Sequence, residues 1–221
     1  MNRSLLHLTI CLIVIPFMTI AQSDSTLIHF KYVSDPELKI SNELNGIQSI
    51  SILCNDTLLH GKKFILTMQE YKTGKMVGGN NFGIRNEDQE VRVFNGKDSI
   101  TISLNTASKV EFSKKDSVML ISVAGKIETN KFKLLVNYPH INFKTDLSGD
   151  ELYSLREIHC TSDDQLKLPL HQKVPVLAYT PPFNTGNGGN SYCILGMEEC
   201  DKWYEKFKVE HYYIFLLEVV E

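Results

Sequence analysis

Hydrophobic and polar residues alternate along most of the chain between Thr26 and Tyr138, which is the pattern of β-strands with one buried face. Ile100, Ile102 and Leu104, for example, alternate with serine and threonine. The same alternation occurs at 28–32, 49–54, 64–69 and 132–137, with shorter runs at 90–94, 110–112 and 117–123. A single apolar face predicts antiparallel strands that cover a core on one side.

Turn residues separate these runs. Lys72–Lys75 predicts a hairpin, Asn95-Gly96 is a strong turn signal, and Ala124-Gly125-Lys126 predicts a reversal or a bulge. Short strands with such spacing predict an immunoglobulin-like antiparallel β-sandwich over residues 22–139. The likeness is one of architecture, because this segment has one cysteine, Cys54, and no tryptophan, whereas antibody domains have a Cys-Trp-Cys pattern.

The pattern changes after Asn137–His140, where Pro139 cannot donate a hydrogen bond to a sheet. We therefore predict a domain boundary here and a small α+β domain over 140–221. Ser148–Glu151 fits a capping box, which predicts a short helix over 149–157.

The rest of this half predicts strands at 174–180 and 191–195 and a helix over 198–207 with Trp203 on its apolar side. The last segment, 211–220, is apolar on both alternating faces. A strand of that kind is buried on both sides, so we expect it in the middle of a sheet with the helix across one face.

The first residues form a pattern of their own. Arg3 precedes an apolar run over 5–20, and small Ala21 is followed by a polar segment. This order is typical of a secretory signal peptide over residues 1–21. The run is short for a transmembrane helix, which needs about 20 apolar residues. We predict an exported protein, periplasmic or extracellular, with no membrane span once the signal peptide is removed.

Charge argues against one class of partner. Cleavage after Ala21 would leave 200 residues and remove one charge, that of Arg3, which changes the formal net charge from −3 to −4. Nucleic-acid-binding proteins usually carry a concentrated basic face. Here Lys62-Lys63 and Lys114-Lys115 are isolated pairs, so we expect no nucleic acid as a partner.

Four of the five cysteines follow the predicted signal peptide: Cys54, Cys160, Cys193 and Cys200. An even number in an exported protein favours disulfides, with three possible connectivities, and buried free thiols are the alternative. The alternation places Cys54 on a core face. No Cys-x-x-Cys pair exists, and no histidine lies at ligand spacing beside the last two cysteines. We expect no metal and no cofactor.

A segment rich in glycine and asparagine follows Pro181-Pro182. It lacks the Lys-Ser/Thr pair of a phosphate-binding loop, so it predicts a hairpin loop. Loops on rigid scaffolds often bind partners. The candidate binding residues, here and in a similar segment at 78–83, are Phe183, Asn184, Asn187, Asn190 and Phe82.

Catalytic motifs are weak. Cys193 with a histidine of the second half would suit a cysteine hydrolase, but Ser191–Ile194 matches neither the papain nor the caspase signature. Asp163 and Asp164 are adjacent, whereas glycosidases need carboxylates that face each other across a cleft. We assign no catalytic residue and keep a secreted hydrolase that uses Cys193 or these aspartates as the alternative.

Four tripeptides resemble the Asp-Ser/Thr-apolar site that Bacteroidetes use for periplasmic O-glycosylation, with Ser25, Thr57, Ser99 and Ser117 as the modified residues. The Ala21-Gln22 junction resembles signal junctions of the same bacteria. The mature chain as a whole resembles secreted two-domain Bacteroidetes proteins of unknown function. This resemblance implies export and assigns no catalytic residue.

The sequence therefore favours an exported, non-enzymatic cell-envelope or extracellular protein that binds an envelope protein or glycan, or has a structural role. The secreted hydrolase is the alternative. A third possibility is an assembly or adhesion subunit completed by strand addition, which requires an unpaired sheet edge.

Overall fold

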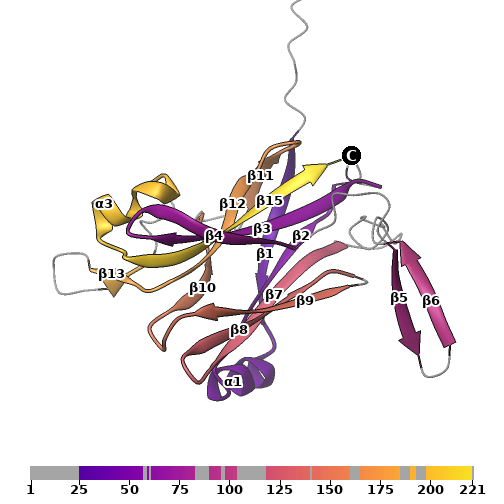
Figure 1. Cartoon of the computed structure of the whole chain (residues 1–221), viewed down its shortest axis with the longest axis horizontal. Helices are drawn as coiled ribbons and strands as arrows, with labels where there is room; N and C mark the ends of the chain where they lie inside the picture. Colours follow the sequence, from indigo (N-terminus) through magenta and orange to yellow (C-terminus); the bar gives the residue numbers. More distant parts are fainter. Residues whose placement is uncertain are drawn as a thin grey trace, which may run out of the picture.

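The computed structural model describes residues 25–56, 59, 61–82, 90–95, 98–103, 118–139, 141–159, 165–184, 190–192 and 198–220, with the backbone only for 90–95, 98–103, 118–120 and 190. The predicted signal peptide lies outside these residues. The described part is mainly β-structure, with two large antiparallel sheets and two small hairpins (Figure 1).

The larger sheet has six strands. In spatial order they are β11 (Gln165–Pro169), β1 (Ser25–Tyr32), β2 (Ile47–Cys54), β7 (Val118–Glu128), β8 (Lys131–Asn137) and β9 (Asn142–Ser148). All neighbours are antiparallel, and β11 and β9 form the two edges.

The second sheet has five strands. In spatial order they are β10 (Ser154–Glu157), β12 (Val174–Thr180), β15 (His211–Val220), β3 (Lys63–Lys72) and β4 (Lys75–Phe82). β10 and β4 are its edges among the described strands, and strand addition requires such an edge.

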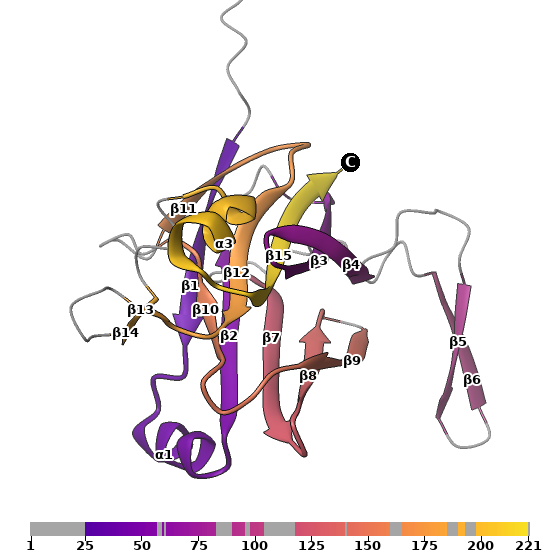
Figure 2. The same cartoon turned by 60° about the vertical axis from the view of Figure 1, so that its left-hand side comes forward.

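The remaining elements are short. The hairpin of β5 (Glu90–Asn95) and β6 (Asp98–Ser103) stands apart from both sheets in two views (Figures 1 and 2). β13 (Phe183–Asn184) pairs with β14 (Asn190–Ser191). The helices with described bounds are α1 (Pro36–Leu44), the 3-10 turn η3 (Cys200–Lys202) and α3 (Trp203–Phe207).

One apolar core lies between the two large sheets. The six-stranded sheet contributes the predicted faces of β2 and β8, and the five-stranded sheet contributes the apolar faces of β3, β12 and β15. The rings of Phe132 on β8 and Tyr179 on β12 stack across this core with centroids 4.2 Å apart. Each large sheet buries one apolar face against the other, so the shared core forms only when both sheets are present.

The last strand, β15, is buried on both faces, as the sequence predicts. Phe215 and Leu217 point into the core between the sheets, while Tyr212 and Ile214 belong to a second cluster on the opposite face. Trp203 of α3 covers that second cluster and lies 5.0 Å from Tyr212, centroid to centroid. The predicted helix thus lies across one face of the sheet, although helical structure begins at Cys200.

The chain does not reverse at Ala124-Gly125-Lys126, contrary to the prediction. These residues lie inside β7, and the reversal comes at Thr129-Asn130, where φ is 52° and 62°. Gly125 is needed because β7 passes close to its neighbour. A Cβ added there would lie 2.6 Å from the Phe132 ring and from the carbonyl oxygen of Lys133.

The predicted helix over 149–157 is also wrong. Asp150 accepts a hydrogen bond from the Leu152 amide at 2.8 Å and closes a turn, after which β10 begins at Ser154. The amide of Leu155 donates to the side chain of Gln48 on β2. Pairing with β12 and this side-chain bond satisfy the backbone hydrogen-bonding groups of β10 in an extended conformation. The capping box at 148–151 is therefore not followed by a helix.

Helix α1 was missed, although it carries ordinary start signals. Asp35 caps it by accepting a hydrogen bond from the Leu38 amide at 2.8 Å, and Pro36 occupies the first turn. The helix ends before Gly46, whose φ is 65°. It has no buried residue, so the apolar periodicity that reveals most helices is weak here.

The strands on either side of Pro139 share both sheets, which does not fit separate domains over 22–139 and 140–221. β8 and β9 flank the predicted boundary and are hydrogen-bonded neighbours. In Figure 1 the yellow β15 lies between the purple β3 and the orange β12, which come from opposite sides of the predicted boundary. The immunoglobulin-like topology predicted for the first half is not confirmed by this strand order.

We expect Gly125→Ala to lower the free energy of unfolding by about 1–3 kcal/mol, the usual cost of overpacking a core. The added methyl group would displace the buried ring of Phe132 from its stack on Tyr179. Urea unfolding of the purified protein measures the change.

The matched control is Gly78→Ala in edge strand β4, where the new Cβ would be 3.5 Å from a Glu70 carboxylate oxygen, an ordinary contact. Its effect should stay within about 1 kcal/mol. Equal free energies of unfolding for the two variants would contradict the packing assigned to Gly125.

Candidate functional site

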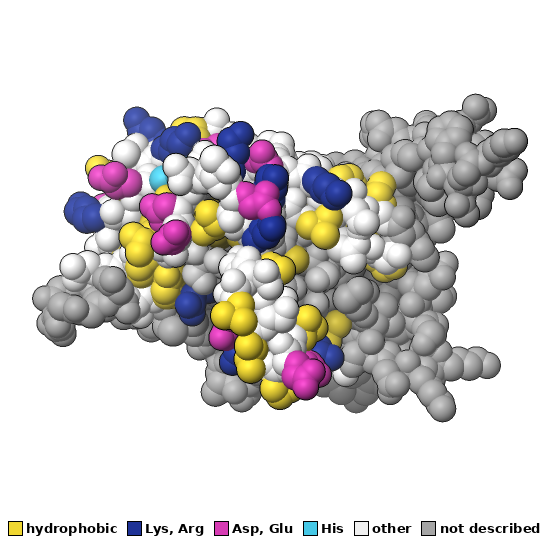
Figure 3. Space-filling model, turned by 90° about the horizontal axis from the view of Figure 1, so that it is seen from below, with side chains coloured by type: hydrophobic (Ala, Val, Ile, Leu, Met, Phe, Trp, Pro, Cys, Tyr) yellow, Lys and Arg dark blue, Asp and Glu magenta, His cyan; other side chains and the backbone are white. Residues whose placement is uncertain are grey.

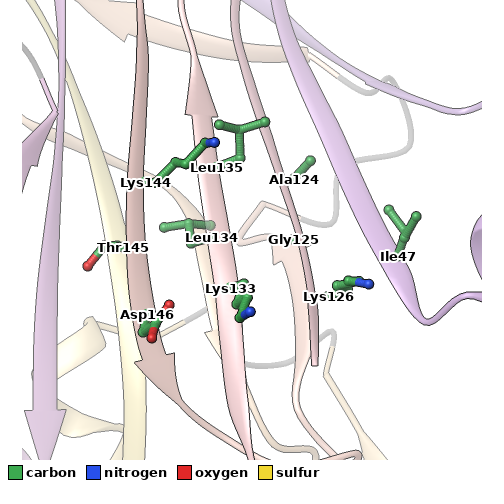
Figure 4. A pocket seen from close by; sticks show the side chains of 10 residues that line it. All are labelled: Ile47, Ala124, Gly125, Lys126, Lys133, Leu134, Leu135, Lys144, Thr145 and Asp146. Atoms are coloured by element: carbon green, nitrogen blue, oxygen red, sulfur yellow. The ribbon is translucent and has the colours of Figure 1, made fainter. Parts of the chain in front are cut away.

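A groove runs across the outer face of the six-stranded sheet. Inward-pointing residues of β2, β7, β8 and β9 enter the core, so the outward positions of the same strands form this surface. The groove has a volume of about 370 Å³, and Figure 4 shows its lining side chains on four neighbouring strands. Its lining residues include Ile47, Ala124, Leu135, Lys126, Lys133 and Lys144.

Strand register explains why these residues meet. Leu135 on β8 is paired with Ala124 on β7 and with Lys144 on β9. One step along the strands, Lys126 is paired with Ile47 on one side and with Lys133 on the other. The first row, Leu135 and Ala124, is an apolar strip that ends at Lys144. The second row runs from Ile47 through Lys126 and Lys133 to Asp146.

Two of the three lysines share one carboxylate, which offsets one of their two positive charges. Glu128 forms ion pairs with Lys126 and Lys133. Hydrogen bonds from these two lysines lower the pKa of Glu128 to about 2, so this carboxylate stays charged throughout the neutral range. Farther along, Lys131 lies 3.6 Å from Asp146.

Lys144 differs from the other lysines of the groove. It is exposed and forms no hydrogen bond or ion pair with any residue that the structure describes. The groove and its rim thus carry an excess of positive charge, although the chain has a net charge of −3. An uncompensated ammonium group beside an apolar strip is suited to a ligand or partner with a negative charge next to an apolar part.

The apolar surface continues beyond the groove. Ile47 is 36% exposed and follows α1, whose Ile40 and Leu44 are 57% and 83% exposed. Ile40 and Leu44 are one helical turn apart and share a face of the helix. Figure 3 views the molecule from below, the end where α1 lies in Figure 1, and shows groups of exposed hydrophobic side chains with lysine or arginine between them.

A second polar cluster lies at one end of the core. Glu70 on β3 accepts hydrogen bonds from His211 Nε2 and from Lys72, both at 2.9 Å. The Tyr153 hydroxyl donates to the backbone oxygen of His211 at 3.1 Å, and the Tyr213 hydroxyl accepts from the amide of Ser148 at 2.9 Å. These bonds tie the segment before β10 to the five-stranded sheet.

Burial raises the pKa of Glu70, but the hydrogen bonds from Lys72 and His211 outweigh it and hold the pKa below its ordinary value of 4.5. Burial raises the pKa of Tyr153 to about 12, so its phenol remains protonated at neutral pH. The cluster therefore has no activated nucleophile, and its groups bond to one another. It is better explained as a structural network than as a catalytic site.

Of the loop residues singled out from the sequence, Phe82, Phe183 and Asn184 are described with their side chains, and none of these three lines the groove. Phe82 and Phe183 are each 3% exposed; Phe82 belongs to the core between the sheets and Phe183 to the cluster under α3. Asn184 is exposed on β13. Asn190 is described by its backbone only, and Asn187 lies outside the described residues.

Most of the residues named for modification or for the hydrolase alternative also lie outside the described residues: Thr57, Ser117, Cys160, Asp163, Asp164 and Cys193. Ser25 is the half-buried first residue of β1, and Ser99 lies in β6 with only its backbone described. These assignments stay predictions.

Cys54 and Cys200 are free thiols, so the predicted disulfides are not found at these positions. Cys54 points into the core, as predicted, where its sulfur bonds with the Thr26 hydroxyl at 3.4 Å and the Leu27 carbonyl oxygen at 3.3 Å. Burial raises the pKa of both thiols, that of Cys200 to about 12. Neither is an activated nucleophile.

The described residues lack two further features. They contain no group of three or more histidine, cysteine, aspartate or glutamate side chains placed to hold a metal ion. Within the same part of the chain, no helix is long and apolar enough to cross a membrane.

No protein-family model, no curated protein and no solved structure matches this chain. Sequence reasoning missed the groove, although one signal was present: Leu135 is an apolar residue on the otherwise polar outer face of β8.

We expect non-reducing peptide mapping to find Cys54 and Cys200 reduced. In the native protein at about pH 8, alkylation of both should be at least about 100-fold slower than in denaturant, because buried thiols of raised pKa form little thiolate. A bridge from either residue to Cys160 or Cys193, or fast native alkylation at either position, would contradict this expectation.

Stability should also depend on the charge of Glu70. Because its pKa is lower in the folded protein, its contribution is fully present above about pH 4.5 and is lost as the pH falls through the folded-state value. Wild-type protein should lose more unfolding free energy than Glu70→Gln between about pH 6 and about pH 3 in urea titrations.

Glu37→Gln, which removes an exposed carboxylate of α1, is the control and should follow the wild-type profile. If the Glu70→Gln profile runs parallel to that of the wild type over this range, the hydrogen-bonded carboxylate does not contribute as described.

Proposed function

We propose that this chain is an exported, non-enzymatic binding protein of the bacterial envelope, acting in the periplasm or outside the cell, and that it holds a negatively charged partner in the groove of the six-stranded sheet. The scaffold for this role is a β-sandwich made from the two large sheets. An immunoglobulin-like relation stays a prediction of architecture only. The signal pattern over residues 1–21 supports export.

One observation carries the binding role: Lys144 is exposed and unpaired among the described residues, and it borders an apolar strip formed by Leu135 and Ala124. An apolar floor supplies affinity, and a charge at its edge supplies orientation and selects the sign of the partner. The scaffold is suited to this task because a strand face held by a packed core is rigid.

The described chemistry favours binding over catalysis. The free thiols at Cys54 and Cys200 have raised pKa values, and the Glu70 network is internally bonded. The groove itself has lysines and one aspartate but no histidine, cysteine or serine among its described lining residues. A partner bound there would meet lysines, one aspartate, one threonine and an apolar strip.

Retention of the mature protein on isolated cell-envelope fractions of its source organism tests this proposal. We expect Lys144→Glu to reduce the retained fraction roughly tenfold, which corresponds to about 1.4 kcal/mol of binding free energy. The reason is that reversal places a negative charge where the partner carries its own. Added salt should also weaken retention of the wild type, because exposed charges are screened.

Lys167→Glu is the matched control, since Lys167 is an exposed lysine on β11, the opposite edge of the same sheet. It carries the same change of charge and should leave retention unchanged. A wild-type protein that binds nothing in envelope fractions, or equal losses for the two variants, would contradict the proposal.

A further inference from the structure

The register of the six-stranded sheet sets the length of the apolar strip. Ile47 lies on β2 and Lys144 on β9, with β7 and β8 between them. Three spacings of about 4.8 Å place the two strands roughly 14 Å apart. Ala124 and Leu135 occupy the intervening strands in the same row as Lys144, whereas Ile47 lies two residues along β2 from Ser49, the partner of Ala124. The apolar surface therefore crosses the sheet obliquely to its strands (Figure 4).

The two ends of the strip differ in charge. At the β9 end, Lys144 is unpaired among the described residues, whereas Lys126 and Lys133 share Glu128. At the β2 end, Ile47 leads to the exposed apolar side chains of α1. The surface therefore has one cationic end and one apolar end.

The described lining residues include no aromatic ring on which a sugar could stack. Their polar groups are ammonium groups, one carboxylate and one threonine hydroxyl. The volume of about 370 Å³ lies near the lower limit of small-molecule sites, which span about 300–1,000 Å³.

From this arrangement we infer that the groove binds a single-chain amphiphile with one anionic head group, such as a fatty acid. The head lies at Lys144, and the chain crosses Leu135 and Ala124 toward Ile47. This inference rests on the proposed function and names the ligand class of the same site. The occupant is a single amphiphile molecule, since the strip of Leu135 and Ala124 ends at one lysine that is unpaired among the described residues.

Titration calorimetry with decanoate, kept below its aggregation concentration, tests the inference. The mature wild-type protein should bind decanoate at least tenfold more tightly than Lys144→Glu does, while Lys167→Glu binds like the wild type. The affinity for decyltrimethylammonium, which has the same chain and a cationic head, should be at least tenfold lower. From hexanoate to decanoate, affinity should rise roughly twofold to fourfold per methylene group that reaches the strip.

Leu135→Asn is a second variant that keeps the lysines and removes the apolar floor, and it should lose the dependence on chain length. Circular dichroism confirms that each variant is folded. Equal affinity of wild type and Lys144→Glu for decanoate, or no binding at all, would overturn the inference. So would equal affinity for the cationic amphiphile.

The outcomes separate the two proposals. Envelope retention that depends on Lys144 without any binding of decanoate would leave the binding role in place and overturn the amphiphile. Binding of decanoate at Lys144 without envelope retention would support the ligand class and overturn the envelope role. Binding only to intact vesicles of anionic phospholipid, and not to monomeric decanoate, would also overturn the single-molecule ligand.

Discussion

The structure depends on the burial of β15 on both faces. Phe215 and Leu217 face the six-stranded sheet, while Tyr212 and Ile214 face α3. Full burial of one such side chain contributes about 1.5–3 kcal/mol, so a strand with apolar residues on both sides is stable only with a layer against each. This requirement places β15 in the centre of its sheet and brings α3 across one side.

The position of β15 also joins the two halves of the chain. Its neighbours are β3 from the first half and β12 from the second, and the opposing sheet mixes the halves in the same way. The six-stranded sheet covers one face of β15 and α3 covers the other, so α3 packs against the five-stranded sheet. On the outer face of the six-stranded sheet, Leu135, Ala124 and the lysines form the groove.

The sequence predicts the strands well because their burial pattern is local. Alternation marks Ile50 and Ile52 on β2 and Phe132 on β8 as core residues, and the structure buries all three. The doubly apolar β15 is identified in the same way. The signals at Ser148–Glu151 mislead, since the turn at Asp150 and pairing with β12 satisfy that backbone in another form.

Strand order is not readable from local patterns, and the domain boundary and the groove both depend on it. Pro139 looks like a boundary, yet β8 and β9 pair across it. The groove combines Ile47 with Lys126 and Lys133, and Leu135 with Lys144, which become neighbours only through the register of four strands. Cys54 and Cys200 are free thiols because of where the fold places them, and the number of cysteines in the sequence does not predict this.

The most direct measurement of the central claim is lysine footprinting. The mature protein is acetylated at low reagent concentration with and without its envelope fraction, and the modification of each lysine is quantified by peptide mass spectrometry. The groove interpretation predicts that Lys144 becomes the most strongly protected lysine, while Lys167 on the far edge of the sheet keeps its rate. Protection that spares Lys144 and falls on other faces of the molecule would contradict it.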